Sequence, residues 1–217
     1  MLYLYAFAER PVRLPDALGL EGSALSAEEA DGVTAVVSAV TGGTVRPSEE
    51  AVLAHAHVVD ALAELNEAVV PARFGRAFSD AEGLRRVMAE RSDALGRALR
   101  HVRGCVELGL RAIPPANATG EAPASGRDYM RWRLAEQHRI ERLGDDLDAP
   151  LAALARASTG MQTAPGLLSA AYLVPRERVD DFRRAVRELE RTHGGVALAC
   201  TGPWPPYSFA TADPDGS

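Results

Sequence analysis

The sequence predicts an α+β protein in two parts, and three observations support this prediction. Short runs rich in valine or aromatic residues alternate along the chain with longer stretches of helical periodicity. The second half repeats that alternation as strand, long helix, strand, helix and strand. The chain then closes on a segment (201–210) in which prolines surround large aromatic residues, a pattern that predicts an extended tail rather than a helix or a central strand.

The first part of the chain shows four recognisable elements. Two aromatic or valine-rich runs predict buried strands, a serine N-cap opens an amphipathic helix, and a proline-containing run predicts a strand at an edge or bulge. In chain order these are strands at 2–8 and 33–40, a helix from Ser48 to about Ala68, and a strand at 69–74. The stretch 11–32 contains several prolines and glycines, so we expect it to be irregular.

The second part is predicted from longer periodic patterns. Its expected elements are a helix at 79–101, a strand at 104–112, a long helix at 127–157 that Pro150 bends or interrupts, a strand at 166–174, a helix after Pro175, and a strand at 196–201. With a short extra strand near Met161, the elements after 104 follow the βαββαβ order of a ferredoxin-like domain. Residues 114–126, which lack large apolar side chains, predict a disordered surface loop.

These elements predict a division of the chain into four segments. We expect a smaller α/β unit at 1–78, a connecting helix at 79–103, a ferredoxin-like domain at 104–202, and an extended tail rich in proline and aromatic residues at 203–217.

Composition excludes several classes of function. The net charge of −6 disfavours proteins that bind nucleic acid or anionic membranes. All 24 basic side chains are arginine, which removes Schiff-base and P-loop lysine chemistry. No apolar run reaches the roughly 20 residues of a membrane span, and the N-terminal apolar stretch is too short for a signal peptide. We therefore expect a cytoplasmic protein that binds neither nucleic acid nor a lipid membrane.

Titratable residues do not form a recognisable catalytic or metal site in the sequence. His55 and His57 are two positions apart on a predicted helix and cannot face one metal ion, so we expect solvated or core-edge histidines. The acidic cluster at 145–148 lacks the spacing of a calcium loop. Nucleophile-elbow, dinucleotide-binding and Walker motifs are missing from the sequence. We therefore expect no metal, no cofactor and no enzymatic activity.

The two cysteines are expected to be free thiols. The alternation of residues 104–112 places Cys105 on the polar face of its strand, whereas Cys200 is in register with inward-facing Val196 and Leu198. Side chains on opposite faces cannot meet disulfide geometry.

Two segments stand out as candidate binding sites. VVPARFGRAF (69–78) places Arg73 beside Phe74 at a tight turn, where an arginine either ties the corner together or recognises a partner. TGPWPPYSFA (201–210) carries Trp204, Tyr207 and Phe209 on a stiff strap, and such aromatic residues either close over the core or anchor a partner. If Trp204 is buried, Trp204→Ala should destabilise the protein by roughly 2–5 kcal/mol; if it is exposed, the indole is available to a partner.

Five motifs make the chain resemble the gas vesicle protein GvpL/GvpF family. They are VVPARFG, ELGLRA, GRDYM, SAAYLV and TGPWPPYSF, and the resemblance runs from the opening YLYA to Phe209. Departures are Arg76 and Ala77 after RFG and the lack of lysine. The resemblance implies a two-domain α+β structure with a ferredoxin-like C-terminal part, and an accessory or minor component of gas vesicles, the gas-filled protein shells of prokaryotic cytoplasm.

The resemblance also implies partners. These are the small hydrophobic major shell protein, contacted during vesicle nucleation, and other gas vesicle accessory proteins. The candidate residues for partner binding or tail docking are Arg73, Phe74, Trp204, Tyr207 and Phe209. Two alternatives remain open: a small-ligand-binding regulatory module with a ferredoxin-like fold, and an enzyme with a convergent polar pocket.

Overall fold

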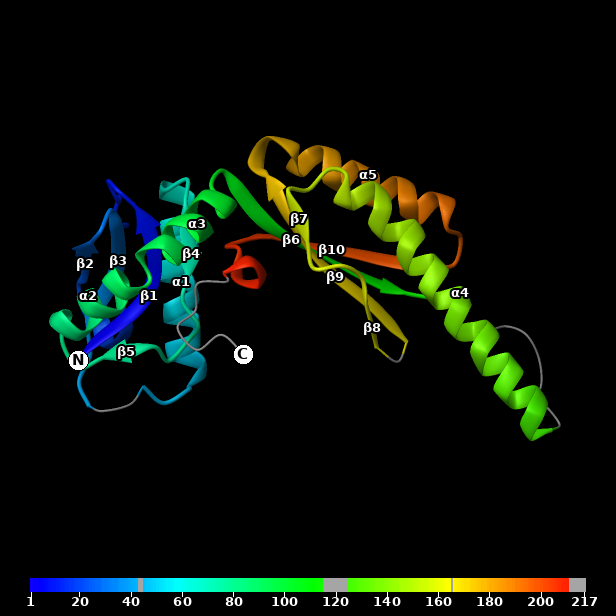
Figure 1. The fold of residues 1–217 in the computed structure, drawn as a ribbon, viewed down its shortest axis with the longest axis horizontal. Helices are drawn as coiled ribbons and strands as arrows, with labels where there is room; N and C mark the ends of the chain where they lie inside the picture. Colours follow the sequence, from blue (N-terminus) through cyan, green and yellow to red (C-terminus); the bar gives the residue numbers. More distant parts are fainter. Residues whose placement is uncertain (43–44, 115–124, 165, 211–217) are drawn as a thin grey trace. The chain divides into compact units, whose positions relative to one another are not determined.

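The computed structural model describes residues 1–42, 45–114, 125–164 and 166–210 (Figure 1). The chain forms two compact units, one made of Met1–Val106 with the C-terminal stretch from Trp204, the other of Glu107–Pro203. Each unit combines one sheet with helices, which confirms the α+β class. Most of the segment expected to be a disordered loop (114–126) and the end of the expected tail lie outside the described residues.

The sheet of the first unit is built around its first strand. Its strands are β1 (Leu2–Glu9), β2 (Leu25–Ala30), β3 (Val33–Ala39), β4 (Val69–Pro71) and β5 (Ala77–Phe78). The order is β2-β3-β1-β4, with β5 also pairing with β1, and the pairs β1–β3, β1–β4, β1–β5 and β2–β3 are antiparallel. Residues Tyr3–Ala8 are all buried. Burial on both faces explains why β1 is apolar throughout rather than alternating.

Strand β2 corrects the expectation that 11–32 is irregular. Ala30 pairs with Val33 across a two-residue turn, and both turn residues, Asp31 and Gly32, have positive φ (46° and 81°). Asp-Gly is among the favoured sequences for this hairpin turn. Because β2 ends the sheet and all six of its residues are at least partly exposed, it lacks the apolar alternation that would reveal a strand.

The N-cap of the first helix is confirmed. Helix α1 (Glu49–Leu65) begins after Ser48, whose hydroxyl oxygen accepts the Ala51 N–H at 3.1 Å. This bond satisfies one of the N–H groups that the first helical turn leaves without a partner. The helix ends at Leu65 rather than Ala68, and β4 ends at Pro71 rather than at 74.

The single helix expected over 79–101 is two helices, α2 (Ala81–Glu90) and α3 (Ser92–Val102). They are divided at Arg91, where φ and ψ (−116° and 12°) leave the helical region. Helix α2 contacts the edge strand β2, whereas α3 contacts β1, β3 and β4. The break therefore lets each half bury its own apolar face against a different part of the sheet, a long-range demand that the local pattern does not carry.

Two helices connect strands of the sheet in the second unit. The elements are β6 (Cys105–Ile113), α4 (Gly126–Ala152), β7 (Ala157–Ser158), β8 (Gln162–Ala164), β9 (Leu167–Pro175), α5 (Val179–Thr192) and β10 (Ala197–Trp204). Helix α4 lies between β6 and β7, and α5 lies between β9 and β10. The strand order is β10-β6-β9-β7, and β8 pairs with β9 as well. The alternation expected in β6 is confirmed, because Val106, Leu108 and Leu110 are buried. The core beneath combines Leu147 and Leu151 of α4 with Phe182 of α5.

Helix α4 ends at Ala152 rather than 157. Pro150 lies in its last turn, where it has no N–H to continue the helical ladder. The chain then proceeds to the two short strands β7 and β8, on either side of the position where one extra strand was expected.

The proline-rich end is a strand followed by a turn, not an extended tail throughout. Strand β10 continues through Pro203 to Trp204, which is compatible with proline because β10 lies at the end of the strand order. Residues Tyr207–Phe209 then form a 3-10 turn, in which the Phe209 N–H donates to the carbonyl oxygen of Pro206 at 3.2 Å.

The two cysteines are free thiols, as expected. Cys105, which was expected on the polar face of its strand, is buried, with 4% of its surface exposed. It belongs to the first unit, whereas β6 from Glu107 onward belongs to the second. Cys200 packs against the core of the second unit, as its register predicted.

Candidate protein-binding surfaces

A buried hydrogen-bond chain fixes the corner of the VVPARFG segment. The Gly75 N–H donates to the phenol oxygen of Tyr3 at 3.1 Å, and that oxygen lies 2.9 Å from Nδ1 of His55. Nε2 of His55 lies 3.2 Å from the carbonyl oxygen of Ala72. Since a carbonyl only accepts, Nε2 carries the proton and Tyr3 donates to Nδ1. These hydrogen bonds thus connect residues 72–75 to β1 and α1.

The buried position of His55 corrects the expectation of a solvated or core-edge histidine. Only 3% of its surface is exposed, which is compatible with its polarity because both ring nitrogens have partners. Burial lowers the pKa of His55 to about 4. Burial likewise raises the pKa of Tyr3 to about 12. Both groups are therefore neutral near pH 7, and the network acts as a structural support.

The two candidate residues of the corner occupy different environments. Phe74 is half-buried, with its ring 6.0 Å from that of Tyr3 and 5.8 Å from that of His55. Arg73, one position earlier, is exposed. The corner thus combines a half-buried aromatic ring with an exposed arginine, so the choice between structure and recognition that the sequence left open applies to each residue separately.

The tail separates its aromatic residues into one anchor and two exposed rings. Phe209 is buried, with 7% of its surface exposed and its ring 6.5 Å from that of His101 on α3. Trp204 is 51% exposed and Tyr207 is 40% exposed. The prolines between them, Pro205 and Pro206, are buried. The condition for a large structural role of Trp204, burial of the indole, is therefore not met, and Phe209 is the buried aromatic ring of this segment.

Electrostatic coupling connects the tail to the corner within the first unit. Burial raises the pKa of the Tyr207 hydroxyl, and the nearby Asp60 and Tyr3 raise it further. Burial and the charge of Glu64 in turn raise the pKa of Asp60 on α1. Tyr207 therefore lies within electrostatic range of Tyr3, the residue that holds the corner through Gly75. We define Arg73, Phe74, Trp204 and Tyr207 as the tail surface.

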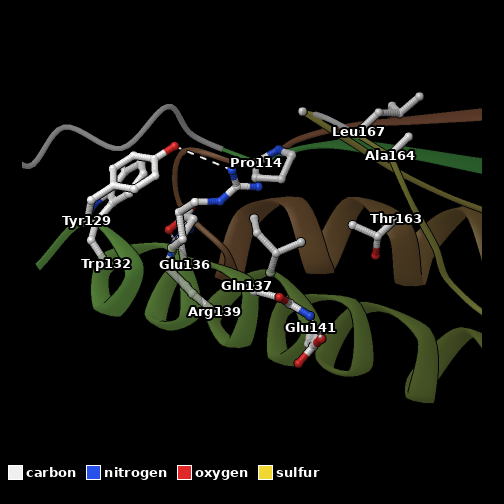
Figure 2. Close-up of a pocket in the computed structure, with 13 residues that line it drawn as sticks. Pro114, Tyr129, Trp132, Glu136, Gln137, Arg139, Glu141, Thr163, Ala164 and Leu167 are labelled. Carbon is white, nitrogen blue, oxygen red and sulfur yellow. Dashed lines mark hydrogen bonds and ion pairs between the residues drawn. The ribbon is translucent and has the colours of Figure 1, made fainter. Parts of the chain in front are cut away.

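A second surface lies in the other unit, along the first half of α4. A groove of about 700 Å³ runs between α4 and the residues at the ends of β6, β8 and β9. Figure 2 shows Tyr129, Trp132 and Glu136 on the helix, with Pro114, Ala164 and Leu167 on the facing side. GRDYM was predicted only as a family motif and the groove was not predicted, although aromatic residues beside arginines at the start of a long helix were a signal for it.

The described residues offer little for metal binding or membrane insertion. Within the ranges that the structure covers, His, Cys, Asp and Glu do not gather in groups of three or more that could hold a metal ion. Of the helices described, none combines the length and apolar character needed to cross a bilayer.

Comparison with known proteins points to a single family. A family model described as "Gas vesicle synthesis protein GvpL/GvpF" matches residues 1–211. Gas vesicle protein F2 of Halobacterium salinarum is 32% identical over 179 residues, which cover 82% of this chain and 76% of that protein. Gas vesicle protein L of a Streptomyces species is 33% identical over 186 residues, covering 74% of this chain and 69% of that protein.

Solved structures share the fold along almost the whole chain. The crystal structure of GvpF from Anabaena superposes with a TM-score of 0.81 at 18% identity, covering 96% of this chain and 95% of that one. The crystal structure of GvpF from Microcystis aeruginosa superposes with a TM-score of 0.77, also at 18% identity, covering 96% and 98% of the two chains.

Proposed function

This chain belongs to the GvpL/GvpF family of gas vesicle synthesis proteins, and we propose that it binds the major gas vesicle shell protein. In this proposal it is an accessory or minor structural protein that supports vesicle nucleation and assembly by limiting aggregation of the free shell protein. It acts in the cytoplasm in association with the vesicle and with other accessory proteins. It uses no cofactor, and it binds neither nucleic acid nor a lipid membrane.

The physical need for such a partner follows from the shell. A subunit that lines a gas space presents apolar surface, and apolar patches of several hundred Å² promote aggregation before assembly. A protein that covers this surface with aromatic side chains would keep the subunit soluble until it is placed. Trp and Tyr suit this role because they bury large area with few rotatable bonds.

The exposure pattern of the tail carries the proposal. Phe209 and the two prolines before the turn are buried, while Trp204 and Tyr207 keep about half their surface exposed on a stiff backbone. A strap that only closed its own core would bury its largest aromatic residue, and here the indole of Trp204 is 51% exposed. We therefore assign shell-protein contact to the tail surface, with Phe209 holding the strap in place.

The ferredoxin-like arrangement of the second unit is part of the same proposal. Its elements follow each other as β6, α4, β7 with β8, β9, α5 and β10, and the strand order β10-β6-β9-β7 places the last strand beside the first. That order supports a split βαβ domain. Such a domain leaves sheet edges that accept an added strand.

Co-expression of the shell protein with and without this chain tests the proposal. We expect the chain to increase the soluble fraction of the shell protein and to be recovered with it in a pull-down. Because the contact is mainly hydrophobic, recovery should change little between low and high salt. The double variant Trp204→Ala/Tyr207→Ala should lose most of this effect. Leu18→Ala, which truncates a 65% exposed apolar residue of the same unit, is the matched control.

The outcomes separate the possible roles. A shell protein that remains equally insoluble, with no complex at any salt concentration, would contradict the proposal. Recovery of this chain only from intact, washed vesicles would favour a structural component over a chaperone-like role. A rise in melting temperature on adding a small ligand would instead favour the regulatory-module alternative.

A further inference from the structure

We propose that the first half of α4 is a second interaction surface, which receives an acidic amphipathic helix of a partner protein. This surface lies in the unit formed by Glu107–Pro203, whereas the tail surface belongs to the unit that contains α1. The inference goes beyond shell-protein binding, because it gives the chain two surfaces of different chemistry and hence the means to connect two partners.

Helix α4 is longer than the body that it packs against. Its 27 residues span about 40 Å, yet its only buried residues are Gly144, Leu147 and Leu151, all in the second half. Figure 1 shows its first turns running beyond the strands of the same unit. The spacing of the buried residues continues backwards through Ile140 to Tyr129, and both line the groove. The stripe that packs on the sheet therefore continues along the groove, into a half of the helix in which no residue is buried.

The uncovered half exposes large apolar side chains on one stretch of helix. Tyr129 is 42% exposed, Met130 59%, Trp132 40% and Leu134 53%. The Tyr129 and Trp132 rings stack 6.0 Å apart at 29°, and Cζ of Arg133 lies 6.0 Å from the centre of the Tyr129 ring. Tyr, Trp, Met and Arg are the residues enriched in interface cores. Rings already held by their neighbours lose little side-chain entropy on binding, which favours recognition.

The charge of this stretch indicates an acidic partner. Residues 126–134 contain three arginines, Arg127, Arg131 and Arg133, but only one acidic residue, Asp128. The whole chain, in contrast, carries a net charge of −6. Among the described residues, Arg127 and Arg131 take part in no ion pair. Arginines near the start of a helix oppose its dipole and reduce helix stability. Folding therefore does not explain their position, whereas attraction to a negatively charged partner does.

The shape and polarity of the groove favour a helix as the occupant. The lining residues on α4 run from Tyr129 to Glu141, about 18 Å along the axis. The groove's polar side chains are largely paired with one another: Arg139 donates to Glu136 at 2.7 Å and 2.8 Å, and Gln137 donates to Glu141 at 2.9 Å. Few groups remain to select a small polar ligand. A helix can place its apolar stripe in the groove and its acids beside the arginines.

Two synthetic peptides test the proposal directly. Both carry the same leucine stripe at helical spacing, one with glutamate and one with arginine on the polar face. In a Trp204→Phe background, Trp132 is the only indole of the protein. We expect the acidic peptide to shift the Trp132 emission to shorter wavelength and to bind saturably by anisotropy. Arg127→Glu/Arg131→Glu should weaken binding at least about tenfold, and added salt should weaken it too.

The control reverses two arginines on the other helix of the same unit. Arg184→Glu/Arg187→Glu alters exposed residues of α5 and should leave peptide binding unchanged. Circular dichroism and melting temperature establish that each variant folds. These measurements involve no shell protein. A lack of peptide binding would therefore not contradict the proposed shell-protein binding, and a lack of shell-protein binding would not contradict the peptide site.

Three results would overturn the proposal. The first is no saturable binding of the acidic peptide, and the second is equal binding of the basic peptide, which would indicate unspecific apolar contact. The third is concentration-dependent self-association that the Arg127→Glu/Arg131→Glu variant abolishes, which would make a second copy of this chain the occupant.

Discussion

The phenol oxygen of Tyr3 lies 2.9 Å from Nδ1 of His55, which joins the first strand to the first helix inside a buried aromatic cluster. Through Gly75 and Ala72 the same two side chains hold the corner that carries Arg73 and Phe74. The position of the candidate binding residues at the corner therefore depends on hydrogen bonds that His55 makes only in its neutral form. This dependence makes the stability of the first unit sensitive to pH.

Stability should fall as the pH drops from about 6.5 towards about 4. Burial lowers the pKa of His55 to about 4, whereas the unfolded chain has the ordinary value near 6.5. Between these pH values the unfolded chain binds a proton that the folded chain does not. The contribution of His55 to the free energy of unfolding is therefore complete above pH 6.5 and is lost as the pH falls. It amounts to roughly 3 kcal/mol. Urea denaturation between pH 7 and pH 4.5 measures it.

His55→Gln isolates this effect. Glutamine can still accept from Tyr3 and donate to Ala72 but does not titrate, so the variant should lose the pH dependence above pH 4.5. His57→Gln, which changes an exposed histidine two positions along α1, should keep it. A His55→Gln profile that runs parallel to the unaltered protein would show that another group is responsible.

Truncation of Phe209 should destabilise the first unit more than truncation of either exposed tail ring. Phe209→Ala removes a buried ring beside His101 and should cost about 3 kcal/mol. Trp204→Ala and Tyr207→Ala remove half-exposed rings and should each cost about 1 kcal/mol or less. Chemical denaturation of the three variants makes the comparison. A larger loss for Trp204→Ala than for Phe209→Ala would contradict the division of the tail into anchor and exposed rings.

Gly19→Ala should destabilise the protein by about 2 kcal/mol through overpacking. A Cβ at this position would lie 2.4 Å from the Tyr5 hydroxyl and 2.8 Å from Oγ of Ser38. The Tyr5 hydroxyl also accepts the Leu20 N–H at 2.6 Å, so this hydroxyl cannot move freely away from the new Cβ. In a Tyr5→Phe background the clash with the hydroxyl is absent, and the cost of Gly19→Ala should be smaller. Gly126→Ala, whose added Cβ would have none of the described residues within 4 Å, is the control.

Both thiols should react slowly with a chromogenic disulfide reagent until the protein unfolds. Cys105 is 4% exposed, and burial raises the pKa of the Cys200 thiol, which reduces its thiolate fraction. At pH 8 we expect slow labelling of the folded protein and prompt labelling of both thiols in urea. Cys105→Ser should leave one reactive thiol under denaturing conditions. Rapid labelling of the folded chain would show that one of the two sites is open to solvent.

Elements whose residues are both apolar and locally distinctive were predictable from sequence. Buried strands favour aromatic and β-branched residues, and this preference located three of them: the strands at 2–8 and 33–40 and the alternating strand after Gly104. The start of α1 was located because Ser48 is an N-cap. Strand β2 was missed because an edge strand needs no apolar face, even though its Asp-Gly turn was visible in the sequence.

Surface sites were less predictable, because a residue type does not reveal whether anything covers it. The sequence nominated five candidates in two segments, yet Trp204, Tyr207 and Phe209 differ in exposure although they belong to the same motif. The groove along α4 was not anticipated, because its existence depends on where the sheet ends beneath a long helix. Helical periodicity continues unchanged from the covered half to the uncovered one.

Local residue patterns and motifs were enough to predict the α+β class, most of the strands and helices, the free cysteines and the resemblance to the GvpL/GvpF family. The packing of distant segments was needed to show that His55 and Cys105 are buried, that one expected helix is divided at Arg91, and that Phe209 rather than Trp204 anchors the tail. Each of these outcomes depends on residues far away in the chain that pack opposite the one concerned, and burial is a property of that pairing rather than of either segment alone.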